Sequence, residues 1–69
     1  SASARQVVAI HRLQETVGLD NLPDDLREMA YLRLENPEMS LRELGEALSI
    51  SRSGANHRIQ RLLEMAKTE

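Results

Sequence analysis

Apolar side chains recur along the chain at the three- and four-residue spacing of an α-helix, and they do so in four separate segments. The first segment covers residues 4–17, and Gly18 is placed directly after it as a helix C-cap. Residues 1–3, which precede the pattern, are expected to be a frayed end. The apolar positions of this first helix are Val7, Ile10, Leu13 and Val17.

A second helix is predicted from Pro23 to about Glu35, after a short connection at residues 19–23. Pro23 suits the opening of a helix, and Asp24 and Asp25 in the first turn face the positive end of the helix dipole. The Asn-Pro pair that follows ends the helix, because a residue before proline avoids the helical region. The apolar residues span more than half of the circumference, which predicts a central, well-covered helix. They are Leu26, Met29, Ala30, Leu32 and Leu34.

A third, short helix begins after Ser40, which forms the capping-box pattern S-L-R-E with Glu43. A break at residues 49–51 separates it from a fourth helix over residues 52–66, for which Ser51 is a natural N-cap. The chain is therefore predicted to be all-α, with four short helices in a single domain. The inward-facing residues of the last two helices are Leu41, Leu44, Leu48, Ala55, Ile59, Leu62 and Ala66.

The third and fourth helices with their connection, about residues 40–66, follow the pattern of a DNA-binding helix-turn-helix. Gly45 is expected where the two helices approach most closely, since a tight turn between crossing helices needs a small residue there. Ile50 is expected to fill the corner between the turn and the core. Many such turns carry Gly where this chain has Ser49, so either Ser49 adopts the left-handed conformation or the turn differs slightly.

The charge of the chain is unevenly distributed. The net charge of −2 argues against general affinity for nucleic acid. Residues 15–46 hold nine acids and three bases, a local charge of −6, whereas residues 51–61 hold three Arg and no acid, a local charge of +3. Because an electrostatic footprint is a local patch, the small total leaves room for a DNA contact at the second of these stretches.

The amino-acid composition argues against several other kinds of site and against a membrane span. The 69 residues include no Cys and only two His, so neither a disulfide nor a structural zinc site is expected, and no cofactor motif is present. The longest apolar run, residues 7–10, is far too short to cross a membrane. The expected location is the cytoplasm, in association with the nucleoid.

A helical wheel of residues 52–66 places a polar arc opposite Ala55. Asn and Gln side chains can contact adenine edges, and Arg can contact guanine edges or phosphates. Arg58 lies nearer the core edge and is expected to extend outward past it. Glu64 faces the same way and would repel phosphate, so base reading is expected in the N-terminal half only. The residues predicted to contact DNA are Ser51, Arg52, Ser53, Asn56, His57, Arg58, Gln60 and Arg61.

Ser51 with its helix start, Arg58 and Arg61 are predicted to contact phosphate. A bare helix N-terminus and Arg side chains both attract anions. The other predicted residues are assigned to base edges or neighbouring phosphates. Gly54 costs about 1 kcal/mol relative to Ala in a helix, so it needs a reason. Two explanations are open: close packing against another helix, or close approach to a DNA backbone.

The motifs G-L-D-x-L-P, R-L-x-N-P-x-x-S-L-x-E-L-G and S-x-S-G-x-N-H-R occur together between residues 18 and 66. With them the chain resembles the C-terminal domain of WhiA, a bacterial regulator of sporulation and cell division. The resemblance implies a DNA-binding transcriptional regulator whose helix-turn-helix is similar to region 4 of sigma factors. It also implies that this chain is a fragment of a longer protein with an N-terminal domain like a LAGLIDADG homing endonuclease, without nuclease activity. In the family pattern, Ser51, Ser53, Gly54, Asn56, His57 and Arg58 belong to the recognition helix.

The function predicted is sequence-specific binding of double-stranded promoter DNA, with residues 52–66 in the major groove. The alternative is a sigma-region-4-like interaction module, in which the acidic residues 15–46 contact RNA polymerase or another regulator. An enzyme is not expected, because His57 lacks a neighbouring carboxylate in a pocket and Asp24 and Asp25 are explained by the helix start.

Overall fold

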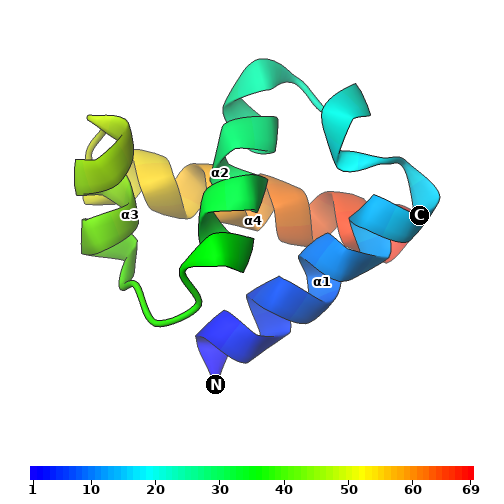
Figure 1. Ribbon diagram of the computed structural model, residues 1–69, viewed down its shortest axis with the longest axis horizontal. Helices are drawn as coiled ribbons and strands as arrows, with labels where there is room; N and C mark the ends of the chain where they lie inside the picture. The colour runs from blue at the N-terminus through cyan, green and yellow to red at the C-terminus, as the bar shows by residue number, and fades with distance from the viewer.

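Every segment predicted to be helical is a helix in the computed structural model, which describes residues 1–69 (Figure 1). The chain contains no strand, so the predicted all-α class is confirmed. Predicted and observed helix ends differ by two residues or fewer, apart from one additional turn of 3-10 helix. The elements are α1 (Ala2–Thr16), η1 (Leu19–Asn21), α2 (Asp24–Glu35), α3 (Leu41–Leu48) and α4 (Arg52–Thr68).

The start of the chain is ordered, so the prediction of a frayed end at residues 1–3 is wrong. Ser1 is the N-cap of α1, and its hydroxyl accepts a hydrogen bond from the Ala4 N–H at 3.3 Å. The Ser3 hydroxyl donates to the Pro37 carbonyl, which ties α1 to the segment after α2. Periodicity missed this end because caps are made by polar side chains, not by the apolar stripe.

The connection between α1 and α2 belongs to the core. The C-cap of α1 is Val17, one residue before the predicted Gly18. Gly18, with φ of 86°, follows this cap and allows the chain to turn there. Leu19 and Leu22 are then almost completely buried, at 3% and 4% exposure. The expected plain connection at residues 19–23 therefore contains the turn of η1 and two core residues.

The second helix buries a different set of residues from the one predicted. Pro23 is its N-cap, and Leu26, Met29 and Ala30 are fully buried, as expected. Its other apolar side chains are only partly buried. Arg33 is instead almost completely buried, at 2% exposure.

The guanidinium of Arg33 joins three parts of the fold. Its Nη1 donates to the carbonyls of Met39 at 2.8 Å and Pro37 at 3.2 Å, and to the Ser3 hydroxyl at 3.2 Å. Burial lowers the pKa of Arg33, and the charge of Glu38 opposes this shift. The start of α1, the end of α2 and the approach to α3 are thus fixed to one another by a single side chain.

The fourth helix contacts each of the other three helices, and it runs along the length of the molecule in Figure 1. Its predicted inner face is confirmed: Ala55, Ile59 and Leu62 are at most 1% exposed, and Ala66 is 6% exposed. These residues form one cluster with the buried side chains of α1, α2 and α3. The opposite face of α4 is left uncovered over its whole length.

The capping box that begins α3 is present. The Ser40 hydroxyl accepts from the Glu43 N–H at 3.1 Å, and the Glu43 carboxylate accepts from the Ser40 N–H at 3.0 Å. Hydrogen bonding of the carboxylate to the Ser40 backbone N–H, and also to the Ser40 side chain, lowers the pKa of Glu43. The local pattern of a Ser followed three residues later by Glu was sufficient to locate this helix start.

The turn between α3 and α4 is as tight as the sequence predicted. A Cβ atom at Gly45 would lie 2.8 Å from the Ile50 carbonyl oxygen and 3.0 Å from that of Ser51. Ser49 has φ of 58° and ψ of 39°, so it adopts the left-handed conformation in place of the more usual glycine. Ile50 packs against the core, and its N–H donates to the Gly45 carbonyl at 2.9 Å.

Replacing Gly45 with Ala is expected to destabilise the domain by about 1–3 kcal/mol, because the new methyl group meets backbone atoms that cannot move alone. Urea unfolding followed by circular dichroism measures the change. Gly54→Ala is the matched control, since its nearest neighbour is the Ser51 hydroxyl at 3.3 Å and helix propensity favours Ala by about 1 kcal/mol. Equal losses in the two variants would contradict the close approach at Gly45.

Candidate nucleic-acid interface

The candidate interface begins at the N-terminus of α4. The Ser51 hydroxyl accepts a hydrogen bond from the Gly54 N–H at 2.9 Å, which confirms the predicted cap. The first turn of α4 contains no acid. Its dipole and its remaining N–H groups therefore present a positive end that favours an anion such as phosphate.

The residues predicted to contact DNA, apart from Arg58, lie on the uncovered side of α4, opposite the buried face of Ala55 and Ile59. The orientation taken from the helical wheel is thus confirmed, whereas DNA contact itself stays a prediction. Those with exposed side chains are Ser51, Arg52, Ser53, Asn56, His57, Gln60 and Arg61.

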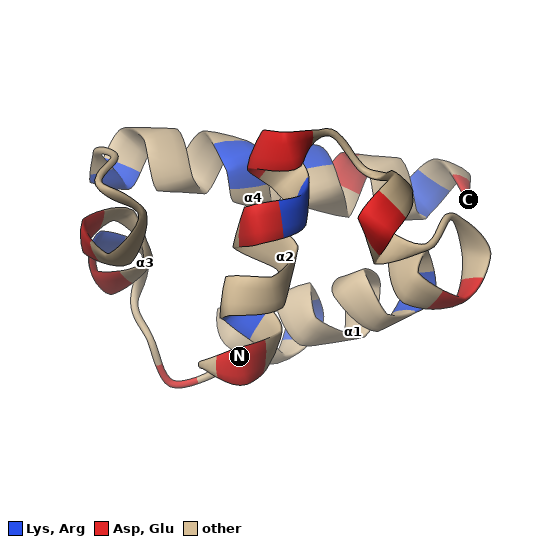
Figure 2. Ribbon diagram, turned by 45° about the horizontal axis from the view of Figure 1, so that its top comes forward, with Lys and Arg blue, Asp and Glu red and all other residues tan.

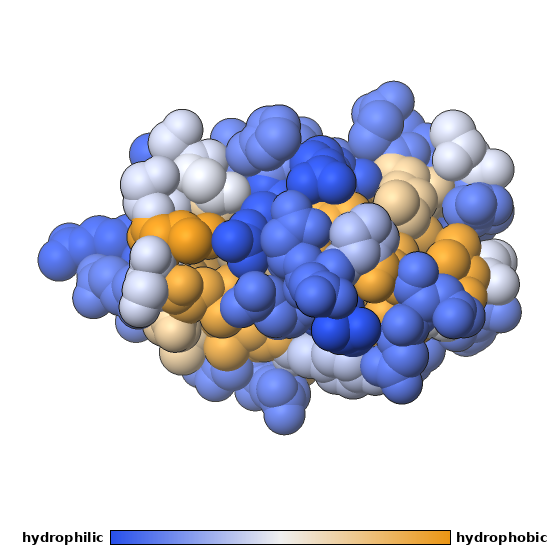
Figure 3. Space-filling view, turned by 90° about the horizontal axis from the view of Figure 1, so that it is seen from above, coloured by the Kyte–Doolittle hydropathy of each residue, from blue (hydrophilic) through white to orange (hydrophobic).

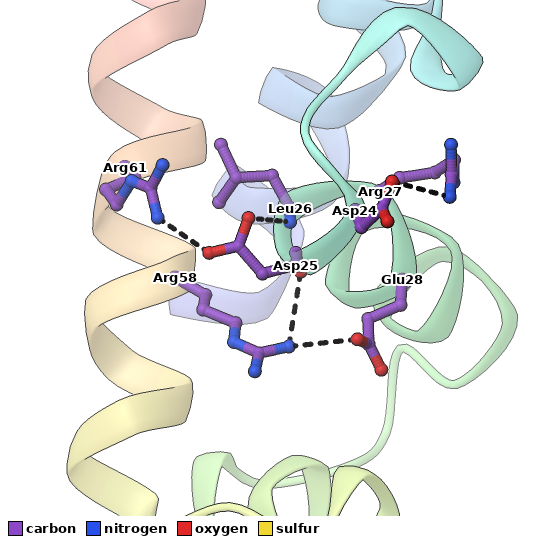
Figure 4. Close-up of polar contacts among 7 residues, drawn as sticks. All are labelled: Asp24, Asp25, Leu26, Arg27, Glu28, Arg58 and Arg61. Atoms are coloured by element: carbon purple, nitrogen blue, oxygen red, sulfur yellow. Dashed lines mark hydrogen bonds and ion pairs between the residues drawn. The ribbon is translucent and has the colours of Figure 1, made fainter.

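Arg58 differs from the prediction that it extends outward past the core edge. Its side chain is only 19% exposed and lies against α2, where Nη1 is 3.4 Å from the Glu28 carboxylate and donates to the Asp25 carbonyl at 3.3 Å (Figure 4). The cause is long-range: a carboxylate and a main-chain carbonyl of α2 lie within reach of the guanidinium and hold it against that helix. The wheel of one helix contains no information about that neighbour.

Arg61 is held by the same part of α2. Its Nη1 lies 2.8 Å from the Asp25 carboxylate, and Figure 4 shows both α4 arginines pointing toward the first turns of α2. Viewed from the top of Figure 1, hydrophilic side chains gather across the middle of the molecule, over the start of α2 (Figure 3). Asp25 and Glu28 are parts of the site that the sequence analysis did not include.

The pKa of Asp25 reports this arrangement. Partial desolvation raises it, but the hydrogen bond and charge of Arg61, the Leu26 N–H and the charge of Arg58 together lower it below the usual 3.8. The carboxylate is therefore charged at neutral pH. A phosphate that approaches Arg61 must compete with this carboxylate.

Arg52 is in a different situation from Arg58 and Arg61. It is exposed in the first turn of α4, and it takes part in none of the ion pairs of the domain. Its guanidinium can therefore be offered to a base edge or a phosphate without breaking an internal contact.

The surroundings of Gly54 test whether this glycine is needed for close packing against another helix. A Cβ atom there would meet the Ser51 hydroxyl at 3.3 Å and Ile50 side-chain atoms at 3.8 Å. All of these neighbours belong to the turn, so close packing against another helix is wrong as the reason for this glycine. Close approach of a DNA backbone stays a prediction.

No group of three or more His, Cys, Asp or Glu side chains is arranged to hold a metal ion. None of the helices combines the length and the apolar character needed to cross a bilayer.

The family described as the WhiA C-terminal HTH domain matches residues 1–66. This chain belongs to that family. The resemblance that the three motifs indicated is thereby confirmed. WhiA relatives called "Probable cell division protein WhiA" are 55% identical in Staphylococcus saprophyticus, 51% identical in Latilactobacillus sakei and 46% identical in Thermoanaerobacter sp., over 69 residues in each case.

These matches cover 96–97% of this chain and 22% of each WhiA relative, so the chain spans about a fifth of their length. The crystal structure of full-length DUF199/WhiA from Thermatoga maritima is similar over 96% of this chain and 23% of that one. The TM-score is 0.92 at 44% identity, which supports the four-helix WhiA fold.

Replacing Asp25 with Asn is expected to lower the melting temperature at neutral pH, because the variant loses the charged partner of Arg61. A lowered pKa in the folded state gives stability that is present above the unfolded-state value and is lost as the pH falls through the folded-state value. The difference between the wild type and Asp25→Asn should therefore begin to shrink near pH 3.8 and disappear as the pH falls through the lower pKa of the folded state. Thermal unfolding between pH 7 and pH 2 measures it.

Asp24→Asn is the matched control for this experiment. The Asp24 side chain is 92% exposed and pairs at 3.0 Å with Arg27 on its own helix, so its removal should change the melting temperature less. A difference between wild type and Asp25→Asn that stayed constant down to pH 2 would contradict the Asp25–Arg61 contact.

Proposed function

We propose that this domain binds double-stranded promoter DNA by placing the N-terminal half of α4 in the major groove. One observation carries the proposal: the exposed, acid-free start of α4 follows a capped, tight helix-turn-helix corner. The corner fixes the angle between α3 and α4. The absence of carboxylates on its first turns allows phosphates to approach.

The exposed polar residues of α4 are assigned by their chemistry. Arg52, Ser53, Asn56, His57 and Gln60 are proposed to contact base edges or the phosphates next to them. Asn56 and Gln60 are suited to adenine, because an amide offers one donor and one acceptor on the same side.

Phosphate contacts are proposed for Ser51 with its helix start, for Arg58 and for Arg61. The two arginines already bind acids of α2, at 3.4 Å from Glu28 and 2.8 Å from Asp25. Each must share its guanidinium between carboxylate and phosphate, so its net contribution to affinity is reduced. Because so few arginines are involved, binding by the isolated domain should be weak and salt-sensitive.

The biological role proposed is transcriptional regulation in cell division and sporulation, in the cytoplasm at the nucleoid. It rests on the WhiA family and on relatives called probable cell division proteins. This chain is proposed to be the DNA-binding part of a longer protein, since it spans only 22% of those relatives. No catalytic step and no cofactor is assigned to it.

A second candidate function is binding of another protein, such as RNA polymerase or another regulator. It is favoured by exposed carboxylates on the side of the domain away from α4, at the end of α2 and along α3. The members are Glu35, Glu38, Glu43 and Glu46. Amide shifts on addition of DNA that were confined to α1, α2 and α3 would favour this candidate.

Replacing Arg52 with Ala is expected to weaken DNA binding by about 1–3 kcal/mol and to relax the base preference at one position. A duplex selected by this chain from a random-sequence library serves as the ligand, and fluorescence anisotropy gives the affinity. Lys67→Ala is the matched control, because it removes one charge from the far end of the same helix, where Lys67 pairs with Glu64 at 3.5 Å. Unchanged binding by Arg52→Ala would remove Arg52 from the interface.

A further inference from the structure

Carboxylates are missing from two stretches of this acidic chain. All eleven Asp and Glu residues lie outside residues 1–14 and residues 47–63. The second stretch contains the proposed recognition surface, and the first covers nearly all of α1. The arginines within the two stretches are Arg5, Arg12, Arg52, Arg58 and Arg61.

The fold brings these two stretches together, because α1 packs directly against α4. Figure 2 shows Lys and Arg on both helices, while most acids gather on α2, α3 and the connecting segments. Both helices run toward the same end of the molecule in Figure 1, and residues of α1 line a common groove with residues of α4 from Gln60 onward. The two acid-free stretches therefore meet at Gln60 and Leu63, and Glu64 borders them on the α4 side.

Arg5 is one of only two cationic side chains that have no partner in the domain. Five of the Lys and Arg side chains form ion pairs with carboxylates. Arg12 and Arg33 donate to main-chain carbonyls. Arg5 and Arg52 remain, both exposed, one on α1 and one at the start of α4.

A groove of about 630 Å³ joins Arg5 to the recognition helix. Arg5 on α1 and Gln60 on α4 both line it, and Ala9 and Leu63 contribute apolar atoms between the helices. Arg12 lines the same groove but is held by the Glu69 carbonyl, its Nε at 3.0 Å from that oxygen. Glu64 and Lys67 of α4 also line the groove, and they pair with each other at 3.5 Å. Arg5 is therefore the charged residue of this groove without an internal partner, and it shares the groove with Gln60, which is proposed to meet DNA.

We propose that α1 is a second DNA-contacting element of this domain, and that Arg5 binds a phosphate of the strand that borders the major groove occupied by α4. The inference rests on the proposed function of α4 and extends it to a helix outside the helix-turn-helix. An exposed guanidinium with no internal partner binds phosphate without loss of an existing contact. Arg61 does not have this advantage, because Asp25 already holds it.

The position of Arg5 next to the recognition helix favours DNA over an acidic protein as its ligand. The surface around Arg5 is continuous with the polar face of α4 through Gln60, so one extended polyanion can span both helices. A duplex presents regularly spaced phosphates on both sides of its major groove. A helix lying alongside the recognition helix is placed to meet one of these two backbones.

The test measures the salt dependence of binding to the selected duplex by the full 69-residue chain. Arg5→Ala is expected to reduce the slope of log K against log salt concentration by about 0.9, which corresponds to an affinity loss of about eightfold at 0.1 M salt. Arg5→Lys should retain most of the slope, because a phosphate contact needs charge more than shape. Circular dichroism verifies that the exposed substitution leaves the fold intact.

Arg12→Ala is the matched control, since it removes the same charge from the same helix two turns further on. Its slope should equal that of the wild type. An unchanged slope in Arg5→Ala, or equal losses in Arg5→Ala and Arg12→Ala, would overturn the contact at Arg5. Either outcome leaves the proposed function intact as long as Arg52→Ala still weakens binding, whereas failure of the wild type to bind any selected duplex would overturn the proposed function itself.

Discussion

The buried face of α4 is the contact on which the other three helices depend. Ile59 and Leu62 occupy its centre, and Ala55 and Ala66 stand toward its two ends, all at most 6% exposed. Small side chains at the ends let neighbouring helices approach closely, and the larger ones fill the space between them. Since α4 packs on each of the other helices through this face, most of the opposite face is left exposed, apart from Arg58 and Arg61, which pair with acids of α2. A domain this small can therefore use one helix both as the centre of its core and as its exposed binding surface.

Local features of the fold could be predicted from the sequence because their causes lie within a few residues. The capping box at Ser40 and the cap at Ser51 each depend on a side chain and a backbone N–H three residues apart. The role of Gly45 followed from the short break after α3. The exposed positions of α4 followed from helical periodicity alone, and so did the buried ones. The sequence therefore predicted which residues of α4 form the candidate site, but not the acids of α2 that pair with two of them.

Contacts between distant residues were not predictable in this way. Arg33 looks like a surface residue in the pattern, yet it donates to a serine 30 residues earlier and a carbonyl six residues later. Arg61 pairs with Asp25 across 36 residues. The periodicity of apolar residues cannot predict either contact. Both involve charged groups, which a sequence pattern places in solvent by default. Such contacts change what an arginine can do: Arg33 acts as an internal tie, and Arg61 is held by Asp25, with which a phosphate would have to compete.

The separation of charge explains how a domain with a net charge of −2 can still favour one approach to DNA. Carboxylates cluster on α2, α3 and the connecting segments, whereas the first half of α4 and most of α1 contain none (Figure 2). A duplex that approaches the acidic side is repelled, and one that approaches α4 is attracted, so the field of the domain orients the encounter. The ion pairs from α2 to Arg58 and Arg61 limit that attraction. In the proposed complex, restrained electrostatic affinity would make nonspecific binding weak, and discrimination would then depend on the proposed base contacts at the start of α4.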